Sequence, residues 1–386
     1  MRLKILAVCF LFLLISMTVW VFLSSPDEKI LGRLFSSPVD VIYTWVDGSD
    51  IEWKKKKDQA SNQNGTTNKF DSQPKRFGLT KNPSAEIELS LASVRKNIGW
   101  VDKIYIVAAR PQTLPNEVLK KYRAKMVYHD EIFPDPSVLP VFSSCAIETC
   151  LHLIPGLNEK FIYFNDDMYI NKPMSVSNFF QSGKPIYRRQ GFKSEPPTAD
   201  LSRNVYLSAV QKGLDLFNGR QNTTPTHQAA AVTKTIMKTA ENKFKKEWNS
   251  ARSTRLRSKD EILPVYVALL LANDTNQVVP PSDEITSLFV DEESIKKNIP
   301  SWSKDRIDEH MICMNDGTDE NIKSLRLKMG LFQENYTADD YYYYYGDGTV
   351  DPDMIIGAKI VGWFTVFLIS FVFYEIYTNP RFESPS

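Results

Sequence analysis

Residues 40–50 read DVIYTWVDGSD, an apolar run that ends in two aspartates on either side of a glycine and a serine. The apolar part predicts a buried strand over residues 40–46, because β-branched and aromatic side chains pack well on a pleated surface. Polar residues then mark the carboxyl end of that strand. They are Asp47, Gly48, Ser49 and Asp50.

Three further apolar runs predict strands at residues 103–109, 125–128 and 160–165. Helical patterns separate them. Pro83 and Ser84 open a helix with one apolar face, and shorter helices are expected at residues 115–123 and 143–154. This alternation predicts an α/β fold whose sheet is mainly parallel, doubly wound and Rossmann-like.

The second half of the chain has a different pattern. Residues 186–225 read as a long irregular insertion, and residues 227–248 and 259–272 read as helices. Residues 58–75 are polar and are expected to form a loop. A helical second half is therefore expected to follow the sheet.

Both ends of the chain are apolar. Residues 5–23 carry no charge and are long enough to span a bilayer, and the basic residues before them keep residues 1–4 cytosolic. A cleaved signal peptide is the alternative. Residues 355–377 predict a second span, with a buried core helix as the alternative, and residues 378–386 a cytosolic tail.

This topology places one catalytic domain, residues 39–335, in the lumen of the Golgi or endoplasmic reticulum, between stems at 24–38 and 336–354. The luminal side agrees with four N-x-[ST] sequons. They begin at Asn64, Asn222, Asn273 and Asn335. A net charge of +1 gives no basic field for a nucleic-acid partner, and none is expected.

The positions of the cysteines and histidines give little information about the function. Cys145, Cys150 and Cys313 are an odd number of luminal cysteines, which leaves one disulfide plus one thiol open. The four histidines are scattered, and no zinc-type spacing is present.

Polar residues follow the fourth predicted strand as they follow the first. Asn165, Asp166 and Asp167 offer oxygen ligands for a hard cation, so Asp166 and Asp167 are predicted to hold Mg²⁺ or Mn²⁺. An ordinary Asx turn is the alternative. Since ligands of doubly wound sheets bind beyond the carboxyl ends of the strands, the two clusters are expected at one site.

Four residues are candidates for catalytic roles. His227, predicted to head a helix, is a candidate general base, with a purely structural histidine as the alternative. Arg257 could bind a transferring phosphate or simply face solvent. Asp47 or Asp50 is expected to hold that phosphate or the metal.

Further residues are candidates for substrate binding. Gly48 would let a phosphate or a base approach the backbone, whereas Trp45 either packs in the core or stacks on a base. The complete set of substrate-binding candidates is Trp45, Gly48, Ser49, Glu86, His129, Asp130, Asn165, Asn315 and Asp316.

These motifs resemble the Stealth family, which includes the α/β precursor of N-acetylglucosamine-1-phosphotransferase and bacterial capsule sugar-1-phosphate transferases. DVIYTWVDGSD resembles the first conserved region, and the stretch that ends in FIYFNDDMYI resembles the second. His227 with RLRSKDE, and CMNDG at residues 313–317, resemble the third and fourth.

The resemblance implies a nucleotide-sugar-transferase-like fold and a phosphotransferase. Such an enzyme moves hexose-1-phosphate, here N-acetylglucosamine-1-phosphate, from a nucleoside diphosphate sugar to a glycan or glycoprotein acceptor, with Mg²⁺ or Mn²⁺. A metal-dependent glycosyltransferase and an inactive membrane scaffold are the alternatives, and a homo-oligomer stays open. The chain departs from the family pattern at Pro83, Ser84, Ser143 and Cys150, and it lacks the proline expected after His227.

Overall fold

The structure, a computed structural model, describes residues 37–63, 85–191, 205–221, 223–281, 285–290 and 309–314. Both predicted membrane spans and the C-terminal stem lie outside these residues, as do nearly all of the N-terminal stem and Pro83, Ser84, Asn315 and Asp316. Within the described ranges, no helix combines the length and the apolarity needed to cross a membrane.

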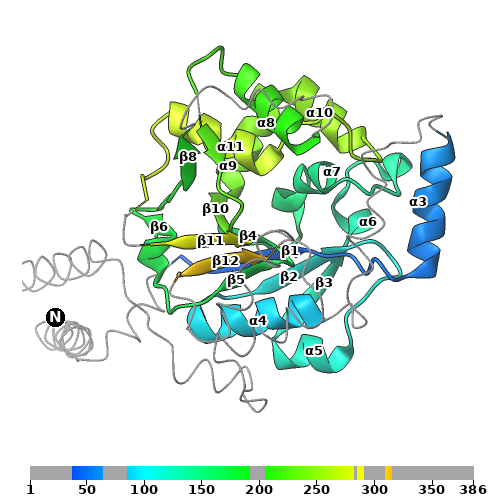
Figure 1. The fold of residues 1–386 in the computed structure, drawn as a ribbon, viewed down its shortest axis with the longest axis horizontal. Coiled ribbons are helices and arrows are strands. Elements are labelled where there is room, and N and C mark those ends of the chain that lie inside the picture. Colours follow the sequence, from blue (N-terminus) through cyan, green and yellow to red (C-terminus); the bar gives the residue numbers. More distant parts are fainter. Residues whose placement is uncertain are drawn as a thin grey trace, which may run out of the picture. The chain divides into compact units, whose positions relative to one another are not determined.

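A five-stranded sheet forms the centre of the fold, in the order β10-β4-β1-β2-β3 (Figure 1). Four of its strands are parallel, and the edge strand β10 runs antiparallel to β4. The strands are β1 (Val39–Thr44), β2 (Ile104–Ala108), β3 (Ala124–Tyr128), β4 (Lys160–Asn165) and β10 (Ala230–Thr233). The predicted mainly parallel α/β sheet is confirmed.

Helices cover both faces of this sheet (Figure 1). On one face, α4 (Ala85–Asn97) and α5 (Asn116–Lys121) pack against alternate strand residues such as Tyr43 and Phe164. The next residues along those strands point to the other face and its helices. These are α7 (Ser144–Glu148), α9 (Lys234–Lys243), α10 (Lys245–Ser253) and α11 (Pro264–Asp274). Because β1, β2 and β4 are buried on both sides, they read as nearly continuous apolar runs in the sequence, whereas the edge strand β3 is only partly buried.

A second, three-stranded sheet has the order β11-β12-β5. Its strands are β11 (Ser287–Val290), β12 (Met311–Met314) and β5 (Met168–Ile170). β5 follows β4 after a two-residue turn, and β12 pairs antiparallel with it, with Cys313 opposite Met168. This pairing brings a distant part of the chain next to Asp167.

Three expectations about secondary structure are wrong. His227 does not head a helix; it lies in the loop between β9 (Thr223–Pro225) and β10, and α9 begins only at Lys234. The predicted irregular insertion contains α8 (Val205–Asp215), part of whose surface is buried. The predicted loop at residues 58–75 is helical at its start, because α3 (Ile51–Gln63) extends into it.

Shorter elements connect these parts. The helix predicted at residues 143–154 is broken into α7 and a 3₁₀ turn at Leu151–Leu153. β8 (Arg189–Gly191) pairs with β9, and α6 (His129–Ile132) follows β3 directly. Cys145, Cys150 and Cys313 are all buried and none of them is in a disulfide, so the pairing left open by the sequence does not occur among them.

Candidate active site

The strand order creates a switch point between β1 and β4. The chain passes from β1 to β2 on one side, and it returns to the other side of β1 with β4. At such a point the connections leave the sheet in opposite directions, and ligands bind beyond the carboxyl ends of the two strands. The register pairs Thr44 with Asn165, so the β1 and β4 clusters predicted from sequence leave the sheet at the same edge.

The turn after β1 is held by its own carboxylates. Asp47 Oδ1 accepts hydrogen bonds from the backbone N–H and the hydroxyl of Ser49, at 2.8 and 2.6 Å. Asp50 Oδ1 accepts from the backbone N–H groups of Glu52 and Trp53, which caps the start of α3. Trp45 and Gly48 are buried, while Ser49 is exposed. Both aspartates therefore have local structural tasks that residue type alone did not specify.

Gln112 contacts this turn from the segment that follows β2, and the sequence alone did not reveal it as a site residue. Its amide oxygen accepts from Asp47 N at 3.2 Å, and its amide nitrogen donates to the Asp47 carbonyl at 2.9 Å and to Asp50 Oδ2 at 3.2 Å. Gln112 is buried and follows β2. It thus ties the β1 turn to the next strand of the sheet, a tertiary contact that leaves no local sequence signal.

The end of β4 is linked to β1 through side chains. Thr44 Oγ1 donates to Asn165 Oδ1 at 3.2 Å, and the Tyr163 hydroxyl donates to the same oxygen at 2.9 Å. Tyr163 also contacts Glu148 Oε1 at 3.4 Å. Asn165 is therefore held in place by two donors, and the chain of contacts continues into the core.

Glu148 is the second residue that the sequence did not reveal. Burial raises the pKa of its carboxyl to about 7, against hydrogen bonds from Val265 N and Tyr163 and the positive charge of Arg257. Arg257 Nη2 donates to Ser144 Oγ at 3.2 Å and is partly buried. Arg257 therefore lies within electrostatic reach of the Glu148–Tyr163–Asn165 chain and does not simply face solvent.

Two of the family departures are accommodated in the described structure. Buried Ser143 donates a hydrogen bond to the carboxylate of buried Glu261, whose other oxygen accepts from Ser258 N. Cys150 is fully buried beside Thr149 Oγ1.

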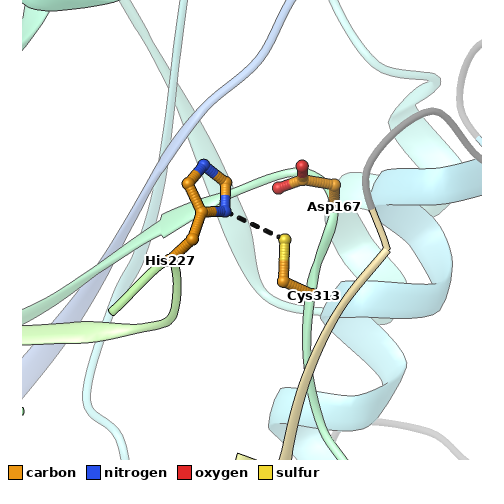
Figure 2. A group of neighbouring side chains, drawn as sticks. All are labelled: Asp167, His227 and Cys313. Atoms are coloured by element: carbon orange, nitrogen blue, oxygen red, sulfur yellow. Dashed lines mark hydrogen bonds between the residues drawn. The ribbon is translucent and has the colours of Figure 1, made fainter. Parts of the chain in front are cut away.

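His227, Asp167 and Cys313 meet at the carboxyl end of β4 (Figure 2). Their ligand atoms all lie within 4.8 Å of one another, and His227 Nδ1 is 3.0 Å from Cys313 Sγ. Asp167 and Cys313 are buried, and His227 is half-buried with its ring edge against Tyr206. The fold thus assembles a carboxylate, an imidazole and a thiol from three distant segments, although the sequence shows no metal-type spacing.

This donor group does not fit Mg²⁺, which prefers oxygen ligands in an octahedral shell, because two of its three donors are nitrogen and sulfur. Asp166 is the neighbouring carboxylate and is half-buried. Its charge, with those of Asp167 and Glu86, adds to the effect of burial in raising the pKa of the Tyr169 hydroxyl. The negative charges of Glu86, Asp166 and Asp167 therefore act together on one buried tyrosine.

The remaining described candidates lie elsewhere. His129 is buried at the end of the edge strand β3, and burial lowers the pKa of its imidazole to about 4. Asp130 forms an ion pair with Arg110, 3.0 Å away. Since β2 separates β3 from β1, these two residues are not brought into contact with the β4 cluster by any hydrogen bond among the described residues.

Two family models match this chain. Residues 37–65 match the description "Stealth protein CR1, conserved region 1", and residues 81–187 match "Stealth protein CR2, conserved region 2". These two matches contain the β1 turn, Gln112, Glu148 and the β4 cluster. The third and fourth regions, around His227 and Cys313, stay predictions.

Curated relatives were found in bacteria. The chain is 30% identical over 306 residues to the capsular polysaccharide phosphotransferase SacB of Neisseria meningitidis serogroup A, a match that covers 74% of this chain and 52% of SacB. It is 29% identical over 291 residues to the exopolysaccharide phosphotransferase SCO6021 of Streptomyces coelicolor, covering 72% and 51%. The chain spans about half the length of these relatives.

Among solved structures, the galactosyltransferase LgtC in complex with donor and acceptor sugar analogues aligns with 83% of this chain and 99% of its own. The TM-score is 0.38 and the identity 8%, which is too low to support an argument. The two conserved regions and the sequence relatives, however, agree with each other. The chain belongs to the Stealth family.

Proposed function

We propose that this chain transfers a sugar-1-phosphate from a nucleoside diphosphate sugar to a hydroxyl of a glycan or glycoprotein. The expected sugar phosphate is N-acetylglucosamine-1-phosphate. One observation carries the proposal: the fold brings His227 to Asp167 at the switch point, in a chain whose relatives are named polysaccharide phosphotransferases. A general base beside a carboxylate at that edge suits an attack by a hydroxyl on a bound phosphate.

The proposed reaction forms one bond and breaks one. The acceptor oxygen attacks the β-phosphorus, the bond from that phosphorus to the bridging oxygen breaks, and nucleoside monophosphate leaves. The sugar keeps its anomeric oxygen and configuration. His227 accepts the proton of the attacking hydroxyl, and Arg257 balances charge on the transferring phosphate.

The β1 turn is assigned to the donor. Gly48 allows the backbone to approach the diphosphate or the base, and the Asp47 and Asp50 hydrogen bonds fix the shape of the turn. Asn165 presents a side chain that Thr44 and Tyr163 already orient. Such preorganisation lowers the cost of positioning two substrates.

The cation of this proposal would be Mg²⁺ or Mn²⁺, and Asp166 would help to hold it beside the donor. A hard cation is commonly bound by one or two carboxylates plus substrate phosphates, and its charge neutralises the departing phosphate. Asp167 was also predicted as a ligand of this cation. Its position beside an imidazole nitrogen and a thiol sulfur favours a softer cation than Mg²⁺.

The nucleotide that is released separates this reaction from its rival. The purified full-length chain is incubated with a donor carrying ³²P in its β-phosphate, with Mg²⁺ or Mn²⁺ and a panel of glycan acceptors. Label in the glycan, with release of nucleoside monophosphate, supports phosphotransfer. Label that stays in released nucleoside diphosphate assigns the chain to the metal-dependent glycosyltransferases, and no turnover with any donor would favour an inactive scaffold.

We also propose that the chain is anchored in a Golgi or endoplasmic reticulum membrane by residues 5–23 and 355–377, with its sequons in the lumen. The support is the length of both apolar segments and the charges that flank them. Alkaline carbonate extraction should leave the chain in the membrane fraction, and glycosidase digestion should increase its mobility. A soluble product, or no mobility change, would contradict this topology.

A further inference from the structure

We propose that Asp167, His227 and Cys313 form a binding site for a borderline divalent cation of the zinc class. This ion differs from the hard cation of the sugar-phosphate reaction, but its ligands include His227 and Asp167, which are also assigned to that reaction. Metal binding at His227 Nδ1 therefore competes with the general-base role of His227, and binding can be tested without any substrate. The inference begins with the donor atoms, which are a carboxylate oxygen, an imidazole nitrogen and a sulfur. Imidazole and thiolate ligands select zinc-class ions, whereas magnesium prefers oxygen.

The geometry suits such an ion. The three donor atoms lie within 4.8 Å of one another, and the side chains point toward a common centre in Figure 2. Donors around a tetrahedral zinc ion are roughly 3.3–3.8 Å apart, given zinc–ligand bonds of about 2.0–2.3 Å. His227 Nδ1 and Cys313 Sγ, 3.0 Å apart, would have to separate slightly, and side-chain rotations would have to bring the longer distances, of up to 4.8 Å, into this range.

The backbone around the three ligands is braced. Cys313 lies on β12 opposite Met168 of β5, and Met314 N donates to the carbonyl of Asp167 at 2.9 Å. His227 is placed by the antiparallel strand β10, which begins three residues later and pairs with β4. Cys313 therefore lies in a paired strand, Asp167 lies in the turn between β4 and β5, and His227 lies shortly before β10. Such an arrangement holds a site more precisely than long loops do.

The number of ligands indicates the kind of site. Structural zinc sites are closed by four protein ligands, whereas three protein ligands leave one position for water or a substrate oxygen. Cys313 is fully buried and Asp167 nearly so, while His227 is half-buried. The open position is therefore expected on the His227 side, facing the switch point.

Binding has a defined proton balance. His227 Nδ1 and Cys313 Sγ are hydrogen-bonded at 3.0 Å, so one proton lies between them. On binding, that proton leaves to solvent, and the sulfur binds as thiolate while Nδ1 binds as neutral imidazole. No oxidant or further reactant is needed.

Cobalt is the probe for this site, because a thiolate bound to Co²⁺ gives a sulfur-to-metal charge-transfer band in the near ultraviolet. The purified full-length chain is titrated with Co²⁺ under reducing conditions, without substrate. We expect one equivalent to produce the charge-transfer band together with visible d–d bands of tetrahedral intensity. One equivalent of Zn²⁺ should abolish both sets of bands, whereas a large excess of Mg²⁺ should leave them.

Matched variants assign the band to Cys313. Cys313→Ser should lose the charge-transfer band, whereas Cys150→Ser, which changes another fully buried cysteine, should keep it. His227→Asn alters a half-buried side chain and covers the case in which the Cys313 variant fails to fold. It should keep the sulfur band only at cobalt concentrations at least about ten-fold higher.

Three results would overturn the proposal. They are the absence of a sulfur band in the unmodified chain, its persistence in Cys313→Ser, and displacement of Co²⁺ by Mg²⁺ as readily as by Zn²⁺. None of them bears on the phosphotransfer proposal, because no donor or acceptor is present. Conversely, a chain that binds Co²⁺ as expected but transfers no phosphate would retain this site and lose the proposed activity.

Discussion

Thr44 and Asn165 are joined by a hydrogen bond of 3.2 Å between the last residues of β1 and β4. The two strands flank the switch point, and each carries one of the polar clusters seen in the sequence. The bond fixes the Asn165 side chain together with the donor Tyr163. It thus couples the two halves of the candidate site at the sheet itself.

Thr44→Val tests this coupling with a side chain of nearly the same shape. Removing the hydroxyl leaves Asn165 with one donor, so we expect kcat to fall about ten-fold or more through misplacement of that amide. The Thr44 hydroxyl is also hydrogen-bonded to the Tyr163 hydroxyl at 3.0 Å, so two hydrogen bonds are lost and the free energy of unfolding should fall by about 1–3 kcal/mol. Steady-state kinetics and thermal melting measure the two effects. Thr239→Val, at an exposed position of α9, is the control, and equal rates in both variants would contradict the coupling.

His227 and His152 form a matched pair for the general-base proposal. His227→Asn should lower kcat by ~10²–10⁴-fold, as expected for loss of a general base. Its melting temperature should stay near that of the unmodified chain, because the ring is half-buried. His152 is buried, with Nε2 2.8 Å from the Glu241 carboxylate and its ring beside Trp248. His152→Asn should therefore lower the melting temperature and leave kcat largely intact. The opposite pattern would assign the structural role to His227.

Two substitutions of Asp50 separate its role as the N-terminal cap of α3 from a role in holding the phosphate or the metal. Asp50→Ala removes the oxygen that accepts from Glu52 N and Trp53 N, and should cost about 1 kcal/mol of unfolding free energy. Asp50→Asn keeps an equally good cap, but it removes the charge and replaces the oxygen that accepts from Gln112 Nε2 with an NH₂ group. We expect Asp50→Asn to cost no more stability than the roughly 1 kcal/mol of that one hydrogen bond. If its kcat is unchanged, Asp50 holds neither phosphate nor metal, and its role is confined to the turn.

Asp166 and Asp167 are expected to be essential for turnover. Asp166→Asn and Asp167→Asn should each lower kcat by orders of magnitude, because each removes a carboxylate from the switch point with almost no change of shape. The dependence on Mg²⁺ or Mn²⁺ should weaken in Asp166→Asn in particular. Asp102→Asn is the control, since Asp102 lies just before β2, at the opposite end of the sheet, beside Lys103. Unchanged rates in both site variants would place the site elsewhere.

The centre of the sheet was predictable because β1, β2 and β4 are buried on both faces. These strands read as nearly continuous apolar runs, and the polar residues that follow β1 and β4 stood out at Asp47 and Asp166. Strand β10 was missed because the sequence AAVT at residues 230–233 is too short and too weakly β-forming to interrupt a helical pattern. Its identity as a strand comes from pairing with β4, a tertiary effect.

The polar side of the site was predictable only in part. Asp167 and His227 were found by residue type, but Cys313 and Gln112 join the site through contacts between distant elements. α3 was missed because it is polar along most of its length, with only Trp53 and Ala60 buried. Local patterns could not show that the chain folds a thiol against an imidazole, since β12 owes its place to pairing with β5.

Glu148 gives a pH dependence of stability that follows from its burial. The carboxyl faces Tyr163 of β4 and Val265 N of α11, and it feels the charges of Arg257 and Glu261. Burial raises its pKa from 4.5 to about 7 in the folded chain. Between these two pH values the unfolded chain releases the proton while the folded chain keeps it.

The free energy of unfolding should therefore fall as the pH rises. The stabilisation that comes from this proton is complete below pH 4.5 and is lost as the pH rises through about 7. Relative to Glu148→Gln, which cannot titrate, the unmodified chain should lose on the order of 3 kcal/mol of unfolding free energy across this window. Thermal midpoints of both chains at several pH values measure the difference, and Glu117→Gln, at an exposed position of α5, should run parallel to the unmodified chain. A difference between the unmodified chain and Glu148→Gln that does not change with pH would show that Glu148 titrates as an ordinary carboxyl, and that the Glu148–Tyr163–Asn165 chain is open to water.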